Sequence, residues 1–487
     1  MALVMRLTVL VTMLVFMVAP VLFAAEGRLS FPAGVSLELE RTVDMNGTPM
    51  EHLIQRDIAR HRRGLLDEVQ GTSIGLSPLS VLGSVDHYTG WPYLTRLKIG
   101  NPQKVFTLVI DTGSDTLWVS CRTCSNCPTS SGVSTRESYD PSESSTSSMF
   151  ACSDKWCQDS IKSGLATCDS SESQDIHCGY DMIYGSGSTI GCSNIQSGGL
   201  AAANLAFDGV IGIGPNRQSV NSQLNSIGQA PMVFSLCLKS SDSGSGILVL
   251  GEAVEPGMVY TPLIPTMYYY SVYLESIAVN GQKLPIDPSV FNSHNRRTFF
   301  DSGTALAYLP DEPYETFLTA ISASVSLSPL VRPFMNNGEH CFATSSSLDL
   351  SFPPVTLHFT GGAELLVMPR NYLLPQGLLD GESLFCLGWK RQEGKPNTIL
   401  GDIVLMDKLI VYDVENMRLG WVNYDCSQAV NITTSNHWNK TSNQWNKRQG
   451  NSGHKSYNVV IPIGVAVMLT CIFGFWRQVS IAHSRLV

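Results

Sequence analysis

The chain has 487 residues, a formal net charge of −9, 43% hydrophobic residues and 15% charged residues. The composition indicates a globular protein, and the length suits two large lobes with processing segments better than one core. A mildly acidic balance gives no indication of nucleic-acid binding.

The first 82 residues contain an apolar stretch followed by a basic one. Residues 1–25 have one early cation, Arg6, then the apolar run 7–23 and two alanines, which is typical of a secretory signal peptide. An uncleaved anchor is the alternative. In the following segment, the stretch 51–63 has helical spacing and many cations, as a solvated basic helix face does.

Two acidic motifs echo each other along the chain. An apolar strand leads into Asp111-Thr112-Gly113-Ser114, and another leads into Asp301-Ser302-Gly303-Thr304. One Asp-Thr/Ser-Gly tripeptide alone is typical of an ordinary turn. Here each copy is followed by a hydrophobic-Gly motif, ending at Gly212 and Gly401, 101 and 100 positions after its acid. This spacing predicts an internal duplication in which each lobe supplies one carboxylate loop.

These paired motifs resemble those of the pepsin-like aspartic proteases. Trp118-Val-Ser-Cys121, the Cys-rich first lobe and the Cys237-Leu pattern narrow the resemblance to the plant nepenthesin-type branch. It covers roughly residues 50–430. It implies an all-β, bilobal double β-barrel or sandwich with few short helices and an active-site cleft between the lobes. The implied activity is aspartic endopeptidase cleavage of proteins or peptides at acidic pH, by a monomer without metal or other cofactor.

The resemblance also assigns roles to the motif residues. Asp111 and Asp301 would be the catalytic dyad. Thr112 and Ser302 would join the two loops by reciprocal hydroxyl-to-backbone bonds, beside Gly113 and Gly303. Ser114 and Thr304 would donate to the outer carboxyl oxygens.

The glycine-rich stretch 184–188 is a hairpin turn on its composition, and the resemblance makes it a flap over the substrate. Tyr184 and Gly185 would border the pocket, and Trp118 would steady the Tyr184 hydroxyl or be a plain core residue. Residues 189–207 show no alternating strand, so we expect a first lobe shortened after the flap. A weak or inactive pepsin-fold binding or inhibitor protein is therefore the alternative function.

The residue patterns and the resemblance together divide the chain into seven expected segments. Within the expected prosegment, the cations of 51–63 would cover the carboxylates until acid neutralises them. The segments are the signal peptide 1–25, the prosegment 26–82, the N-terminal lobe 83–245, the C-terminal lobe 246–426, a stalk 427–456, an apolar segment 457–476 and a tail 477–487.

Twelve of the 13 cysteines lie between Cys121 and Cys426, which indicates six disulfides in a secreted protein. By resemblance, the expected pairs include Cys341 with Cys386 and Cys237 with Cys426. A metal site at Cys121, Cys124 and Cys127 is disfavoured by this context.

The C-terminal part predicts a membrane attachment. The stalk contains the glycosylation acceptors Asn431 and Asn439. Residues 457–476 carry no charge and are long enough to cross a bilayer, with Arg477 on the cytoplasmic side. A glycolipid-anchor signal is the competing interpretation. Either places the catalytic domain in the secretory pathway, outside the cell membrane or on the cell-wall side.

The second lobe shows clear local signals. Alternating or apolar runs predict strands at 246–251, 269–279, 355–359, 409–413 and 418–421. Asn280-Gly281 predicts a two-residue hairpin turn, and the Pro and acids from Pro310 onward predict the start of a helix.

Overall fold

The computed structural model describes the first of two compact units, Met1–Thr434, in most of its length; the second unit is Ser435–Val487. The described residues are 35–41, 71–72, 93–127, 136–145, 147, 153, 157–158, 167–168, 178–179, 190–196, 207–226, 230–240, 245–266, 269–293, 296–326 and 328–432. The predicted segments 1–25, 51–63 and 457–476 lie outside this set, as do Tyr184, Gly185 and Asn439.

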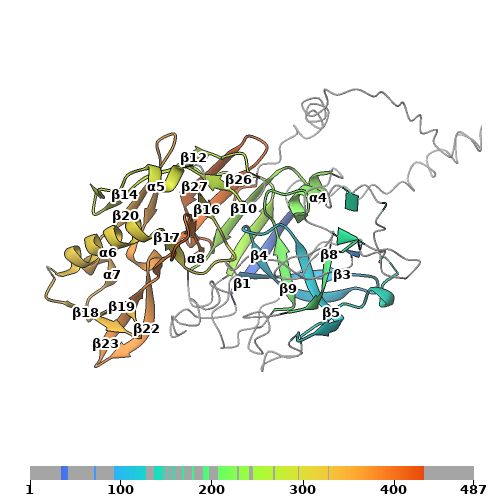
Figure 1. Cartoon of the computed structure of the whole chain (residues 1–487), viewed down its shortest axis with the longest axis horizontal. Helices are drawn as coiled ribbons and strands as arrows, with labels where there is room; N and C mark the ends of the chain where they lie inside the picture. Colours follow the sequence, from blue (N-terminus) through green and yellow to red (C-terminus); the bar gives the residue numbers. More distant parts are fainter. Residues whose placement is uncertain are drawn as a thin grey trace, which may run out of the picture. The chain divides into compact units, whose positions relative to one another are not determined.

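Strands dominate the described elements (Figure 1). The largest sheet contains strands from both predicted lobes. Its order is β12 (Val259–Pro262), β27 (Arg418–Asn423), β26 (Lys408–Asp413), β10 (Val233–Leu238), β11 (Ser245–Leu250), β1 (Val35–Arg41), β3 (Tyr93–Ile99), β4 (Lys104–Asp111), β9 (Gly209–Gly212), β5 (Leu117–Ser125), β8 (Ile190–Ile195) and β2 (Gly71–Thr72).

Smaller sheets and short helices complete the described fold. One sheet has the order β13 (Ser271–Val272), β16 (Thr298–Phe300), β25 (Thr398–Leu400), β17 (Ala307–Leu309) and β24 (Trp389–Arg391). The others are β15 (Gln282–Lys283), β14 (Leu274–Val279), β20 (Val355–Phe359) and β21 (Ala363–Val367); β18 (Val331–Asn336), β19 (Glu339–Thr344), β23 (Glu382–Leu387) and β22 (Leu373–Leu379); and β6 (Thr167–Cys168) with β7 (Cys178–Gly179). The helices are η1 (Pro141–Glu143), α4 (Val220–Ser226), α5 (Ser289–Asn292), α6 (Asp311–Ser326), α7 (Leu348–Ser351), η3 (Pro369–Asn371) and α8 (Asp402–Leu405).

The predicted duplication is visible in the strand order. In the first lobe β4 runs parallel to β9, β9 antiparallel to β5, and β5 parallel to β8. In the second lobe β16 runs parallel to β25, β25 antiparallel to β17, and β17 parallel to β24. The two halves therefore repeat one four-strand arrangement, and each delivers an acidic loop at the end of its first strand. The all-β, bilobal prediction is confirmed.

Residues 189–207 show no alternating pattern in the sequence, but they do contain a strand. Ile190–Ile195 forms β8, which pairs with β5 on one side and with β2 on the other. Gly191, Cys192 and Ser193 are all buried, so the strand lacks the apolar–polar alternation of a half-exposed strand. A disulfide from Cys192 to Cys121 of β5 also holds it. Strand β8 therefore forms because it pairs with β5 and β2, and not because its own sequence has a strand pattern.

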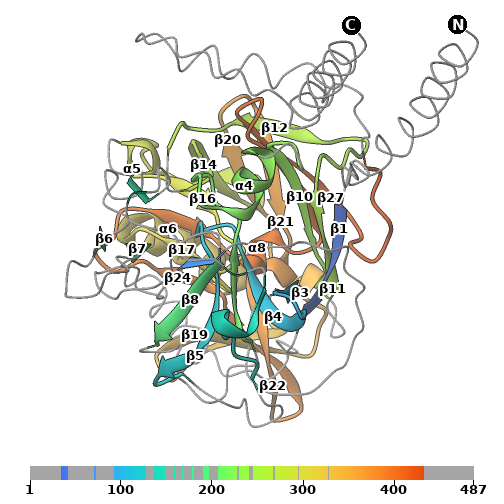
Figure 2. The same ribbon diagram turned by 90° about the vertical axis from the view of Figure 1, so that its right-hand side faces the viewer.

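Strand β1 belongs to the expected prosegment but lies inside the largest sheet. It pairs antiparallel with β11 from Val35 opposite Leu250 to Glu40 opposite Ser245. At its end, Arg41 lies opposite Tyr93 of β3. Figure 2 shows β1 running alongside β11, near β10 and β27. The N-terminal segment thus adds a strand to the same sheet that carries β4.

Most local predictions for the second lobe are confirmed. Strands β11, β20, β26 and β27 occupy four of the predicted runs, but the run 269–279 is divided into β13 and β14, which belong to different sheets. Asn280 and Gly281 have φ values of 50° and 73° between β14 and β15, as a two-residue hairpin of the expected type requires. Helix α6 begins at Asp311 and carries two acids in its first turn.

Four disulfides join described cysteines. Two of them connect Cys237 to Cys426 and Cys341 to Cys386, the pairs that the resemblance implies. The other two connect Cys121 to Cys192 and Cys124 to Cys127. The Cys237–Cys426 bond fastens the last described turn of the chain beside β10 of the largest sheet.

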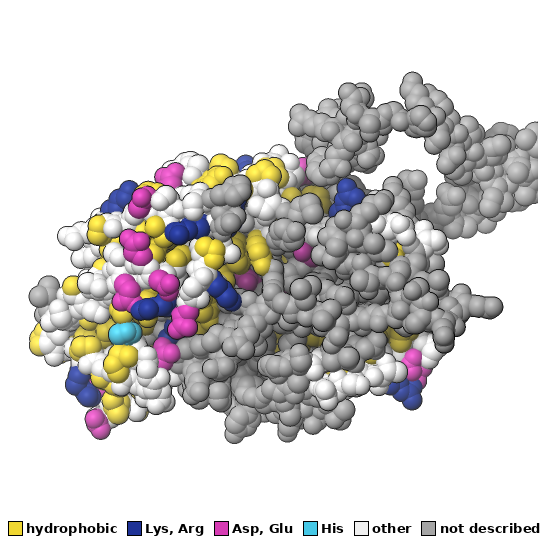
Figure 3. All heavy atoms as spheres, in the orientation of Figure 1, with side chains coloured by type: hydrophobic (Ala, Val, Ile, Leu, Met, Phe, Trp, Pro, Cys, Tyr) yellow, Lys and Arg dark blue, Asp and Glu magenta, His cyan; other side chains and the backbone are white. Residues whose placement is uncertain are grey.

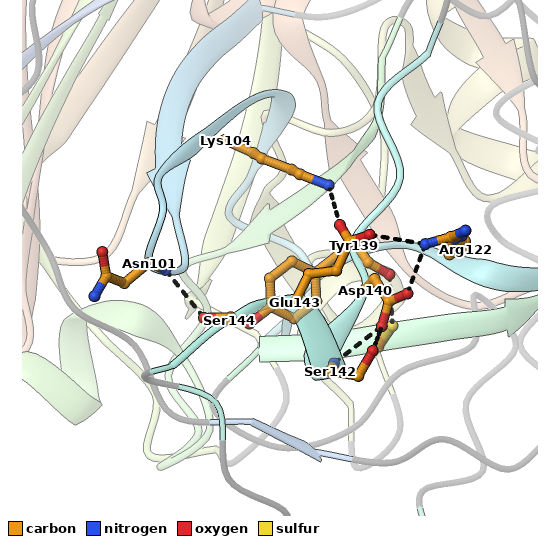
Figure 4. Close-up of polar contacts among 9 residues, drawn as sticks. Asn101, Lys104, Arg122, Tyr139, Asp140, Ser142, Glu143 and Ser144 are labelled. Atoms are coloured by element: carbon orange, nitrogen blue, oxygen red, sulfur yellow. Dashed lines mark hydrogen bonds and ion pairs between the residues drawn. The ribbon is translucent and has the colours of Figure 1, made fainter.

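A corner of exposed charges holds η1 against the neighbouring strands (Figure 4). Glu143 accepts from Lys104 at 2.9 Å and from Arg122 at 2.8 Å, and Arg122 also contacts Asp140 at 3.1 Å. Hydrogen bonds from Ser142, and then the nearby Arg122, keep the pKa of Asp140 below its usual value. Exposed ion pairs each contribute little to the free energy of unfolding. These contacts therefore orient η1 more than they stabilise the fold.

Acidic and basic side chains are interspersed on the described part of the face in Figure 3. Pairs such as Arg332 with Glu382, at 2.9 Å, and Arg370 with Asp349, at 3.6 Å, bring opposite charges together.

Gly401 should be intolerant of any side chain. A Cβ atom there would lie 2.1 Å from Leu306 O and 2.4 Å from Thr304 O, because β25 crosses closely beside the second acidic loop. We expect Gly401→Ala to lower the free energy of unfolding by about 3 kcal/mol. Gly394→Ala is the control, since Gly394 has a φ of +63° but open space around it, and should cost about 1 kcal/mol. Equal losses in denaturant titrations would contradict the crossing argument.

Lys408, at the start of β26, is a buried cation. Its ammonium donates to Met406 O at 3.1 Å, and burial lowers its pKa from 10.5 to about 8. Below about pH 8 both the folded and the unfolded chain hold the proton, so the cost of burying the charge is fully present. Between the two pKa values only the unfolded chain binds the proton, so stability rises with pH.

Replacing Lys408 with methionine should therefore stabilise the protein most at acidic and neutral pH. We expect Lys408→Met to raise the free energy of unfolding by about 2 kcal/mol at pH 6. The gain should shrink by pH 10, in urea titrations at both pH values. The exposed Lys283→Met variant serves as control and should show no such pH dependence. An equal gain for Lys408→Met at both pH values would be inconsistent with the lowered pKa.

Candidate active site

The two motif acids occupy equivalent places in the repeated strands. Asp111 is the last residue of β4, and Asp301 directly follows β16. Both side chains are buried, with 4% and 2% of their surface exposed. The residues of β4 and β16 that lead into the two acids are apolar and buried in the core. The packing of these strands therefore fixes the positions of the carboxylates.

Each carboxylate receives the same pair of donors from its own loop. For Asp111, the Gly113 amide donates to Oδ1 at 2.8 Å and the Ser114 hydroxyl donates to Oδ2 at 2.6 Å. For Asp301, Gly303 N and Thr304 Oγ1 donate at 3.1 and 2.8 Å. Donors of this kind favour the charged carboxylate and fix its orientation.

Reciprocal hydrogen bonds join the two loops. Thr112 N donates to Ser302 Oγ at 3.2 Å, and Ser302 N donates to Thr112 Oγ1 at 2.9 Å. The two hydroxyls then donate onward to carbonyls of the opposite strand, Thr112 to Phe300 O at 3.1 Å and Ser302 to Ile110 O at 3.0 Å. All four bonds are buried, and together they make a nearly two-fold joint.

The joint brings the first loop directly against the second carboxylate. A Cβ atom built on Gly113 would lie 2.5 Å from Asp301 Oδ1. Only glycine fits at this approach. The structure therefore brings together all eight motif residues that the sequence singles out, in one buried cluster.

Two further residues near the loops, Tyr270 and Asp115, are not marked by the motifs themselves. The hydroxyl of Tyr270, which precedes β13, donates to Ile213 O at 2.8 Å and accepts from Asn221 Nδ2 at 3.3 Å. It thus links the second lobe to the chain that follows β9, and burial raises its pKa. Asp115 follows the first motif, and its Oδ1 accepts from Asn216 N at 2.9 Å. In the sequence, the only sign of these residues is that a polar group interrupts an apolar run.

Asp208, which precedes β9, supports the strand that carries Asp111. Its carboxylate accepts from Thr107 N of β4 at 2.8 Å and from Glu137 N at 2.9 Å. Burial raises the pKa of Asp208 despite these donors. Arg136 also donates to Phe207 O and lies over the Phe207 ring. The insertion between β5 and β8 is thereby tied to β4.

Trp118 lies in β5 and is buried in a small cluster with Leu94, Val109, Phe207 and Val210. These contacts fit a core aromatic residue. Its expected partner Tyr184 and the neighbouring Gly185 lie outside the described residues. Within the described part of the chain, no group of three or more His, Cys, Asp and Glu side chains is arranged to hold a metal ion.

Comparison with known proteins gives a consistent result. Residues 92–423 match the family described as eukaryotic aspartyl protease. The chain belongs to the eukaryotic aspartyl protease family. It is therefore a peptide hydrolase of the aspartic type.

The chain is similar to several plant aspartic proteinases. Aspartic proteinase 36 of Arabidopsis thaliana is 34% identical, over 70% of this chain and 75% of its own length. Aspartic proteinase nepenthesin-1 of Nepenthes gracilis is 30% identical, over 69% and 78%. The crystal structure of edgp has the same fold, with a TM-score of 0.53 and 17% identity, and the match covers 75% of this chain and 96% of that one.

Removing the Thr112 hydroxyl should weaken the joint. Thr112→Val leaves the Ser302 amide without an acceptor and Phe300 O without that donor, at a cost of about 3 kcal/mol in unfolding free energy. Thr261→Val is a matched control, because Thr261 is also buried and, among the described residues, its hydroxyl makes a single hydrogen bond, to Thr360 O at 2.8 Å. This variant should lower the free energy of unfolding by about 1 kcal/mol. Chemical denaturation of both variants tests this. A cost for Thr112→Val no larger than the control would contradict the joint.

Proposed function

We propose that the protein is an acid endopeptidase in which Asp111 and Asp301 are the catalytic dyad. The observation that supports this most strongly is the matched set of donors on the two carboxylates, with the reciprocal joint between their loops. Every position of the family's paired motif is filled by a residue of the expected type.

The chemistry follows from two carboxyls that share one environment. Two such groups cannot easily both ionise, so one keeps its proton while the other acts as a base, as in pepsin-like dyads generally. The ionised carboxylate takes a proton from a water molecule as the water oxygen bonds to the peptide carbonyl carbon, and the protonated carboxyl gives its proton to the carbonyl oxygen. As the C–N bond breaks, the carboxyl that took the water proton gives it to the leaving nitrogen, and the other carboxylate takes a hydroxyl proton back from the tetrahedral intermediate. Titration belongs to the pair and not to either residue.

The flap is part of the same proposal. Tyr184 and Gly185 would cover the bound peptide, and Trp118 would support Tyr184 from β5. The inactive binding protein is the weaker alternative, because both acids and all four of their loop donors are present.

We also propose that residues 26–82 act as a prosegment. Strand β1 supports this, because its pairing with β11 and β3 ties the segment to the sheet beside β4. Cations of 51–63 would cover the carboxylates until acid neutralises them. The lobes 83–245 and 246–426 would then form the mature enzyme.

The disulfides favour an oxidising compartment and thus the secretory pathway. We propose that residues 1–25 direct the chain there and that 457–476 attach it to the membrane, as a spanning helix or as a lipid-anchor signal. Among the residues the structure describes, no helix is long and apolar enough to cross a membrane. Asn431 is exposed, and with Asn439 it would carry glycans on the stalk 427–456.

Loss of either acid should abolish hydrolysis. At roughly pH 4, with a denatured protein substrate, we expect Asp111→Asn and Asp301→Asn each to lower the cleavage rate at least about 100-fold. Prosegment removal in the full chain should fail in both variants. Asp380→Asn is the control, because Asp380 is an exposed surface acid, and should cleave normally.

Cleavage that persists in Asp111→Asn would rule out the dyad mechanism. A folded, disulfide-bonded unmutated protein that cleaves nothing would instead favour the binding-protein alternative.

A further inference from the structure

Tyr270 is a buried tyrosine that contacts both lobes. Its side chain is 2% exposed. Its ring meets Phe234 of β10 and Tyr412 of β26 at steep angles, with centroids 5.6 and 4.9 Å apart. Edge-to-face contacts of this kind favour one direction of the ring. The position of the Tyr270 hydroxyl is therefore set by packing in the core.

The Tyr270 hydroxyl makes two hydrogen bonds to the first lobe. It donates to Ile213 O at 2.8 Å and accepts from Asn221 Nδ2 of α4 at 3.3 Å. Burial raises the pKa of Tyr270, so the phenol keeps its proton and remains a donor at acidic and neutral pH. Ile213 directly follows β9, the strand that runs beside β4, so the bond reaches the chain next to the first acidic loop.

The accepting carbonyl belongs to a peptide group that also contacts the acidic loop. Ile213 O and Gly214 N are atoms of one peptide group, which is planar. Gly214 N donates to Ser114 O at 2.8 Å, and Ile213 N donates to Asp111 O at 2.9 Å. A Cβ atom on Gly214 would lie 2.8 Å from Ser114 O, so the two backbones are in direct contact. The Tyr270 bond therefore orients a peptide group whose other side holds the acidic loop.

Ser114 connects this peptide group to the first catalytic acid. Its hydroxyl donates to Asp111 Oδ2 at 2.6 Å. A hydroxyl on a short side chain can point at a fixed carboxylate only while its own backbone is held in place. The bond from Gly214 N to Ser114 O holds that backbone. A displaced Ile213–Gly214 peptide group would therefore disturb the orientation of the Asp111 carboxylate.

The second lobe holds its corresponding peptide group without help from the first. Asp402 directly follows Gly401, and its carbonyl accepts from Met406 N of α8 at 2.9 Å. In the first lobe the next helix, α4, begins only at Val220. The carbonyl of Ile213 is bonded to a side chain of the other lobe instead. This difference makes the first acidic loop depend on Tyr270 and leaves the second loop independent of it.

We propose that Tyr270 is a positioning residue for the dyad: its hydroxyl holds the Ile213–Gly214 peptide group, and through Ser114 it keeps the Asp111 carboxylate oriented. This inference rests on the proposed function of Asp111 and Asp301. Because Tyr270 is buried in the core, it acts through the loop and does not touch the substrate.

The test compares Tyr270→Phe with Tyr372→Phe in the full chain, at a temperature where both variants are folded. Tyr372 is also a buried tyrosine, but its hydroxyl donates to Pro353 O at 2.8 Å, within the second lobe. On a peptide substrate at roughly pH 4, near the carboxyl pKa range, we expect Tyr270→Phe to lower kcat about 5-fold with KM nearly unchanged. Tyr372→Phe should keep the kcat of the unmutated protein.

A Ser114→Ala background tests the route of the effect. In that background the bond from residue 114 to the carboxylate is absent, so Tyr270→Phe should lower kcat by less than about 2-fold further. A full 5-fold loss in this background would show that Tyr270 does not act through Ser114.

Hydrogen exchange gives a measurement that does not depend on activity. In Tyr270→Phe, peptides covering 111–116 and 212–216 should exchange about 5-fold faster. A peptide covering 300–305 should keep its rate, because α8 holds the second loop. If both acidic loops exchange faster to the same degree, or if KM changes as much as kcat, the inference is wrong. An unmutated chain without activity would refute the proposed function, and exchange would still decide the role of Tyr270.

Discussion

The site depends on the reciprocal hydrogen bonds between Thr112 and Ser302. These residues are far apart in the sequence, yet each gives its amide to the hydroxyl of the other, at 3.2 and 2.9 Å. Every group in the joint is buried, so a broken bond leaves an unsatisfied polar atom and not a solvated one. The joint therefore strongly favours a single arrangement of the two loops, and that arrangement places Gly113 against Asp301.

The repeated sheets make the joint possible. In each half, a strand that leads into the acidic residue runs parallel to a strand that leads into the glycine, β4 with β9 and β16 with β25. The crossings at Gly212 and Gly401 leave no space for a side chain, so backbone packs on backbone beneath both carboxylates. The large sheet then supplies the buried aromatic support, with Tyr412 on β26 and Phe234 on β10.

The features that were predicted correctly are those that depend on residues adjacent in the sequence. The acidic loops, the Asn280-Gly281 turn and helix α6 are specified by residues that lie next to one another. Strand β8 was missed because its pairing and its disulfide are tertiary and its buried residues do not alternate. The position of β1 in the sheet depends on its pairing with the distant strands β11 and β3. No local pattern encodes such contacts.

A double-mutant cycle on the joint tests the central claim most directly. Thr112→Val, Ser302→Ala and the double variant would be compared in unfolding free energy and in kcat on one peptide substrate. If the two residues act as one joint, the second change costs little after the first, with a coupling energy of about 2 kcal/mol. Additive losses in both quantities would show that the loops are held independently, and would contradict the account.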